Sequence, residues 1–61
     1  MAKYISQHVA LLIIAKFMVK HNIPEDVIKR LLITFNTTTY NRLWAPEHIE
    51  LVKKKILEKY E

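Results

Sequence analysis

The polar residues between positions 36 and 42 have the types and spacing best suited to chemistry in this chain. The run reads Asn36-Thr37-Thr38-Thr39-Tyr40-Asn41-Arg42. An Arg side chain can bond a guanine edge with two hydrogen bonds, and an Asn side chain can do the same with adenine. A Thr hydroxyl can bond a phosphate, and a Thr methyl can contact thymine. The run therefore carries donors and acceptors suited to reading bases.

The other polar residues form no arrangement typical of catalysis or of a metal site. The chain has no Cys, so it can form neither a disulfide nor a thiolate ligand. The residues His8, His21 and His48 are never three or four positions apart, the spacing that places two ligands on one face of a helix. No set of Ser, His and acid stands out. We therefore expect no enzymatic activity, no metal, no cofactor and no small-molecule substrate.

The charge and composition narrow the class of protein further. Ten Lys and Arg outweigh six Asp and Glu, and the net charge of +4 permits nucleic-acid binding without requiring it. The absence of Gly argues against hairpins and phosphate-binding loops, which need residues that tolerate positive φ. A chain of this size buries only about 60% of its unfolded surface, so small domains often need a partner. We expect that partner to be a second copy.

The most apolar stretch, residues 9–19, is expected to be a buried helix rather than a membrane anchor. Lys16 interrupts it, and it is shorter than the roughly 20 residues that a membrane-spanning helix needs. No small-residue cleavage site follows it, so it does not resemble a secretory signal. We therefore expect a cytoplasmic protein without membrane contact.

Apolar residues spaced three and four apart predict helices along the whole chain. The first is expected over residues 5–21, ending at Asn22, a residue type that tolerates the left-handed conformation. The second is expected to begin at Pro24 and to end near residue 33 or 34. Glu25 and Asp26 then place negative charge at the positive end of its dipole.

Two further helices complete the expected fold. The third covers residues 36–44, with Asn36, Thr37 or Thr38 as its cap. The last begins at Pro46 and runs to about residue 59. The expected fold is therefore one all-α domain over residues 1–61, a small bundle of about four helices without a strand.

The apolar residues of the first helix predict two surfaces. One broad face is expected to pack on the domain itself, and it consists of Tyr4, Ile5, Leu11, Leu12, Ala15, Met18 and Val19. Ile13, Ile14 and Phe17 lie on the other side, among lysines. An apolar surface there needs a cover, so these three residues are expected to form the dimer interface.

The later helices each carry one apolar stripe, and Trp44 adds a large aromatic side chain just before Ala45 and Pro46. We interpret Trp44 as a core residue rather than a base-stacking one. The expected core residues of the second and last helices are Val27, Ile28, Leu31, Leu32, Ile49, Val52, Ile56, Leu57 and Tyr60.

The run Thr39-Tyr40-Asn41-Arg42-Leu43 resembles the recognition helix of helix-turn-helix DNA-binding proteins of the phage repressor and Cro type. Those helices often continue from Ser or Thr with a Thr, an apolar residue, two polar residues and another apolar residue. Residues 23–28 resemble the start of the family's positioning helix, and residues 46–49 the start of its next helix. The chain departs from the family at Lys29, where a small residue is usual, and in residues 32–35, which lack the usual Gly.

The resemblance implies a helix-turn-helix in a dimeric transcriptional regulator, of phage or other prokaryotic origin, that binds double-stranded DNA. Tyr40 and Leu43 are three apart and would anchor the helix to the core. The base-contacting residues would be Thr38, Asn41 and Arg42, and the phosphate-contacting residues Thr37, Lys29 and Arg30.

A second interpretation of the same residues stays open. Asn36 and the threonines can simply cap a short helix, with Arg42 in solvent. The chain would then be a helical protein-binding module, such as an adaptor or an inhibitor, without nucleic-acid binding. An exposed apolar surface around Ile13 and Phe17 is compatible with either function.

Overall fold

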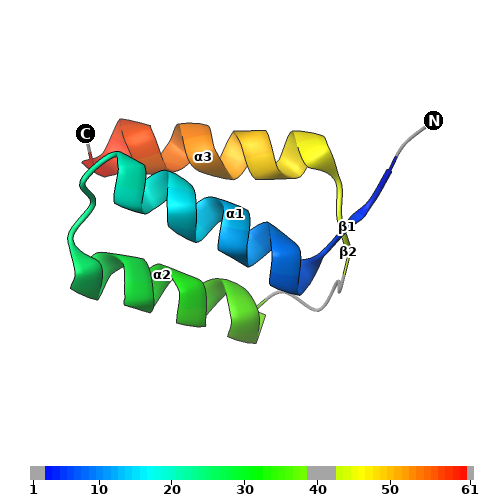
Figure 1. Ribbon diagram of the computed structural model, residues 1–61, viewed down its shortest axis with the longest axis horizontal. Coiled ribbons are helices and arrows are strands. Elements are labelled where there is room, and N and C mark those ends of the chain that lie inside the picture. The colour runs from blue at the N-terminus through cyan, green and yellow to red at the C-terminus, as the bar shows by residue number, and fades with distance from the viewer. Residues whose placement is uncertain (1–2, 39–42, 61) are drawn as a thin grey trace.

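The computed structural model describes residues 3–38 and 43–60. Three helices and a small two-stranded sheet make up this part of the chain, in the order β1, α1, α2, β2, α3. Their bounds are Ile5–Ser6 for β1, Gln7–Lys20 for α1, Glu25–Thr38 for α2, Leu43–Trp44 for β2 and Pro46–Tyr60 for α3. Helix α1 packs against both α2 and α3 (Figure 1). The mostly helical character expected from the sequence is confirmed.

The predicted helix over residues 36–44 does not form as a separate helix in its described parts. Residues 36–38 are the last turn of α2, and Leu43–Trp44 is a strand; residues 39–42 lie outside the described residues. Helix α2 continues because Phe35 extends its apolar stripe four residues beyond Leu31. The hydroxyls of Thr34 and Thr37 donate to carbonyls four residues earlier, at 2.8 and 3.0 Å, so these threonines lie inside the helix rather than capping a new one.

The two short strands correct the expectation that the fold has no strand. They pair antiparallel, with Ile5 opposite Trp44 and Ser6 opposite Leu43. Ser6 also caps α1, because its side-chain oxygen accepts a hydrogen bond from the Val9 amide at 3.3 Å. Strands of two residues carry no periodic signal, so the sequence pattern could not predict them. The pairing places the start of α1 beside the start of α3.

The turn between α1 and α2 follows the local signals in the sequence. Asn22 has a φ of 59°, so its predicted left-handed conformation is confirmed. The amides of Asn22 and Ile23 donate to the carbonyls of Val19 and Met18, at 3.1 and 3.0 Å, in the pattern of a Schellman motif. Ile23 and Met18 are both buried, which adds the hydrophobic contact that often accompanies this motif.

The core collects side chains from all three helices and from β2. Trp44 is only 2% exposed, which confirms its expected place in the core. The apolar stripes expected for the second and last helices also face inward, except for Leu57, which is half-buried and does not belong to the core cluster. The buried apolar residues of the described chain are Ala10, Ile14, Met18, Ile23, Ile28, Trp44, Ile49 and Ile56.

Helix α1 meets the core with only part of the face that the sequence suggested: Met18 is buried and Leu11 packs against the core, as expected. Its fully buried residues are Ala10, Ile14 and Met18. Leu12 and Val19, which were expected to face the core, are 50% and 64% exposed. Apolar residues occur on nearly every side of α1, so periodicity alone does not determine which side packs inward.

Candidate functional site

The two basic residues expected to contact phosphates lie exposed on α2 and are paired with acids of the same helix. Lys29 Nζ lies 3.3 Å from Glu25 Oε1, and Arg30 Nη2 lies 3.7 Å from Asp26 Oδ2. All four side chains are well exposed, so each pair contributes little to stability and can exchange partners readily.

The predicted base-contacting set falls almost entirely outside the described residues. Asn41 and Arg42 lie outside them, and of Thr38 the structure describes only the backbone, at the end of α2. Thr37, expected at a phosphate, is exposed on the last turn of α2, where its hydroxyl donates to the Ile33 and Thr34 carbonyls at 3.0 and 3.2 Å. The structure therefore does not show whether these residues lie together on one surface.

The residues expected at a dimer interface belong largely to the packing of one chain. Ile14 is fully buried in the core. Ile13 and Phe17 are half-buried and pack against that core. The Phe17 ring also lies 4.5 Å from the His21 ring and 5.4 Å from Lys53 Nζ, so side chains of α1 and α3 already surround it.

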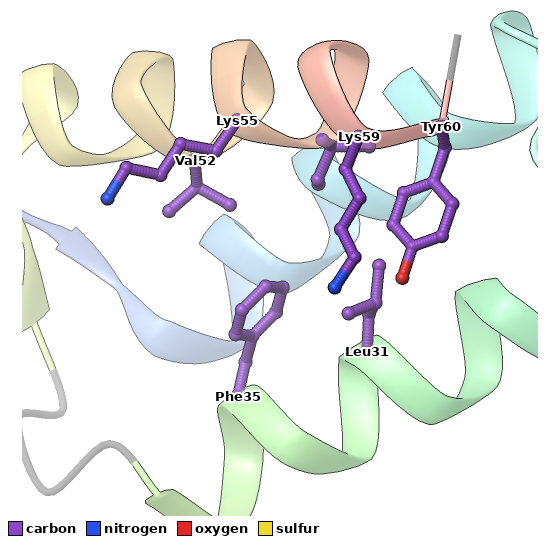
Figure 2. A pocket seen from close by; sticks show the side chains of 7 residues that line it. Leu31, Phe35, Val52, Lys55, Lys59 and Tyr60 are labelled. Atoms are coloured by element: carbon purple, nitrogen blue, oxygen red, sulfur yellow. The ribbon is translucent and has the colours of Figure 1, made fainter.

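A groove between α2 and α3 is the feature that the sequence pattern did not reveal. Its cavity volume is about 170 Å³. Figure 2 shows Leu31 and Phe35 on α2 facing Val52 on α3 across the opening, while Lys59 and Tyr60 extend from α3 toward α2. The lining residues are Leu31, Phe35, Val52, Lys55, Ile56, Lys59 and Tyr60.

The spacing of the residues explains how two helices build this groove. Leu31 and Phe35 are four apart on α2, and Val52 and Ile56 are four apart on α3, so each pair forms an apolar stripe along its helix. The Phe35 ring also packs against the buried Trp44 ring, which it meets edge-on at a centroid distance of 6.2 Å. The groove thus rests directly on the core.

The charge at the mouth of the groove is positive, and Lys59 Nζ lies 5.6 Å from the centre of the Tyr60 ring. Lys55 and Lys59 are four apart on α3, and neither forms an ion pair within the described residues. Lys53, by contrast, pairs with Glu50 at 3.2 Å. None of the three glutamates of α3 lines the groove. Two like charges at this spacing repel each other slightly, so an anion placed between them would be favoured.

A second groove lies between α1 and α2, and it differs in its charge. Its cavity volume is about 360 Å³, and no Lys, Arg, Asp or Glu from the described part of the chain lines it. At one end, Gln7 Nε2 donates to Asn36 Oδ1 at 3.3 Å. The lining residues are His8, Leu11, Leu12, Ala15, Leu32, Ile33 and Asn36.

The described residues hold neither a candidate metal site nor a membrane-spanning helix. No three His, Cys, Asp or Glu residues gather there in a way that could hold a metal ion. Among the described helices, none combines the length and the apolar character needed to cross a membrane. The chain matches no known family model, and it shows no significant similarity to a curated protein or to a solved structure.

Proposed function

We propose that this chain is a helical protein-binding module, whose α2/α3 groove receives an apolar side chain from an acidic segment of a partner protein. One observation carries the proposal: an apolar groove has two lysines at its mouth, Lys55 and Lys59, that form no ion pair within the described residues. Helix-in-groove recognition commonly combines an apolar anchor with charged residues beside it.

The size of the groove favours a single side chain over a whole small molecule. Its volume of about 170 Å³ is below the roughly 300–1,000 Å³ typical of pockets that enclose drug-sized ligands. It is close to the roughly 150 Å³ of an engineered apolar cavity that binds benzene. A Leu or Phe side chain therefore fits it better than a metabolite. Buried apolar or aromatic anchors of this kind often supply most of the binding energy of an interface.

The positive charge at the mouth of the groove favours acidic residues beside the apolar anchor in the partner segment. Carboxylates four residues apart on a helix have the same spacing as Lys55 and Lys59 on α3. Such pairs at a solvent-exposed rim mainly raise the association rate and select the partner, and they weaken as salt rises. The segment that fits best is a short acidic helix with one apolar anchor.

Selection from a library of helical peptides displayed on phage tests this function. We expect the enriched peptides to carry a Leu or Phe anchor and acidic residues four apart. These peptides should bind the Lys55→Glu/Lys59→Glu variant at least about tenfold more weakly, a loss of about 1.4 kcal/mol. The matched control is Lys54→Glu, which changes an exposed lysine of α3 that does not line the groove. Equal binding to both variants would contradict the proposal.

Duplex DNA is the second candidate partner, and the chain would then be a dimeric transcriptional regulator of the helix-turn-helix type. The observation in its favour is a second pair of exposed lysines four apart, Lys16 and Lys20, which also have no ion pair within the described residues. Together with Lys55 and Lys59 and the net charge of +4, they provide sites for phosphates.

Titration of duplexes at two salt concentrations distinguishes this candidate from the first. A DNA-binding chain should bind random duplex below about 100 μM in low salt and weaken steeply as salt rises. Its sequence preference should change when Asn41→Ala is combined with Arg42→Ala, because both are expected to contact bases. If the chain binds no duplex in low salt, DNA is excluded and the protein-binding function remains.

A further inference from the structure

We propose that two copies of this chain associate through the α1/α2 groove. This surface is distinct from the α2/α3 groove, and the inference does not depend on the proposed function. Leu12 on α1 and Ile33 on α2 line the α1/α2 groove, yet they remain 50% and 63% exposed. Large apolar side chains gathered in one place on a surface typically mark an interaction site.

A second copy is the occupant that the charge of the described lining residues favours. In a two-fold interface each residue meets the same surface patch on the other copy, so a charged patch would repel itself. Among the described residues, no Lys, Arg, Asp or Glu lines this groove, and the polar ones that do are His8 and Asn36. The α2/α3 groove fails the same test, because pairing it with itself would bring Lys55 and Lys59 of both copies together.

The neighbouring residues are compatible with this surface being covered. Val19, on the same side of α1, is 64% exposed and would extend the apolar contact. The flanking Lys29 of α2 is already paired with Glu25, so each copy carries both signs of charge at that edge. A chain of 61 residues also has little core of its own, so it gains more from such a contact than a larger domain would.

Association at this face leaves the α2/α3 groove open. The two grooves share no residue: Leu31 and Phe35 line one, whereas Leu32, Ile33 and Asn36 line the other. A dimer would therefore present two free α2/α3 grooves. Two linked sites can bind a partner that carries two matching segments far more tightly than one site can.

Sedimentation velocity of the full chain over a range of concentrations tests the proposal. We expect a monomer–dimer equilibrium for the unmodified chain and a monomer for Leu12→Glu/Ile33→Glu. The matched control is Leu51→Glu, since Leu51 is 48% exposed on α3 and lines neither groove. This control should still dimerise. An unmodified chain that remains monomeric up to about 1 mM, where even weak complexes form, would overturn the proposal.

A second measurement is independent of any variant's ability to fold. Half of the chains are labelled with carbon-13 and mixed with unlabelled chains, and contacts between copies are detected by isotope-filtered nuclear Overhauser spectroscopy. The methyl groups of Leu12 and Ile33 should show contacts to the other copy. A dimer whose contacts between copies arise from Val52 and Ile56 instead would show that the wrong groove was chosen.

Discussion

Trp44 connects the small sheet, the core and the candidate site. Its ring is buried, it meets Phe35 edge-on, and it lies 4.7 Å from the His48 ring. Phe35 in turn lines the α2/α3 groove. The Trp44 Nε1 atom is buried and has no hydrogen-bond partner within the described residues. A buried donor without a partner lowers stability by about 1–3 kcal/mol.

This geometry predicts a graded response to substitution at position 44. Trp44→Ala should lower the free energy of unfolding by about 3–5 kcal/mol, because it leaves a large cavity. Trp44→Phe should be clearly milder, because it keeps most of the ring contacts and removes the unpaired N–H. Urea unfolding followed by circular dichroism gives both values. If the two variants are equally destabilised, the packing assigned to the indole is wrong.

Asn22 gives a second prediction at the level of a residue, because its φ is 59°. Asn22→Val should destabilise the chain by roughly 1–2 kcal/mol, since a β-branched residue disfavours the left-handed conformation. Asn22→Gly should be close to neutral, because Gly adopts that conformation without steric strain. The melting temperatures of the two variants provide the comparison, and equal losses would rule out a backbone effect.

Residue-level signals were the part of the fold that the sequence predicted best. The left-handed Asn22, the acidic first turn at Glu25 and Asp26, and the start of the last helix at Pro46 are all confirmed. Each depends on the chemistry of a few neighbouring residues, so no tertiary information is needed. The position of Trp44 in the core follows equally directly from its size and apolar surface.

The boundaries and faces of the helices were harder to predict than their existence. Helix α2 runs through a Thr-rich segment in which the Thr37 hydroxyl bonds a carbonyl of its own helix, and the sequence does not distinguish such a threonine from a cap. Helix α1 is apolar on most sides, so only its packing against α2 and α3 decides that Ile14 is buried and Leu12 exposed. The prediction of a dimer interface at Ile13, Ile14 and Phe17 assumed that this side of α1 faces away from the core. Ile14 is instead buried in the core.

Ser6 provides a test of the junction between β1 and α1. Its side chain caps α1 while its backbone pairs with Leu43, so only the cap depends on the hydroxyl. Ser6→Ala should therefore lower the free energy of unfolding by about 0.5–2 kcal/mol. Ser6→Asp should restore most of it, because Asp is an equally good cap. Chemical denaturation of the three chains supplies the measurement; an unrescued Asp variant would argue against the cap.

Neither groove could be predicted from the sequence, because each is lined by residues from two helices whose relative placement depends on α1. The apolar residues Leu31, Val52 and Ile56 were expected in the core, where a stripe of this kind usually packs. Leu31 and Val52 are only half-buried because α2 and α3 leave a gap between them, whereas Ile56 lines the same gap and is still buried in the core. Lys55 and Lys59 lie outside the apolar stripe of α3, so the sequence pattern alone does not distinguish them from ordinary solvated lysines.

At the scale of the whole molecule, the two grooves differ in the charge of their described lining residues. The uncharged α1/α2 groove suits a second copy, and the α2/α3 groove with Lys55 and Lys59 suits an acidic partner. The net charge of +4 favours encounter with anionic partners of any kind, and so it does not distinguish an acidic protein from DNA. An acidic protein and DNA are distinguished by whether an apolar side chain of the partner contacts the apolar lining of the α2/α3 groove, which we call its floor.

Raising the salt concentration separates the two contributions to binding at the α2/α3 groove. For an acidic peptide, affinity should fall only moderately between low salt and about 0.5 M, because burial of the apolar anchor is insensitive to screening. Duplex DNA would lose affinity by orders of magnitude over a comparable range. Calorimetric titrations at both salt concentrations measure the difference. A peptide affinity that disappears at high salt would mean that the groove floor contributes nothing.

The most direct test of the protein-binding function is a titration of the nitrogen-15- and carbon-13-labelled chain with a selected acidic peptide, followed by nuclear magnetic resonance. The proposal predicts that the largest shift changes occur at Leu31, Phe35, Val52 and Ile56, and that they are lost in Lys55→Glu/Lys59→Glu but kept in Lys54→Glu. Shift changes centred on Leu12 and Ile33, or equal binding by the two lysine variants, would contradict it.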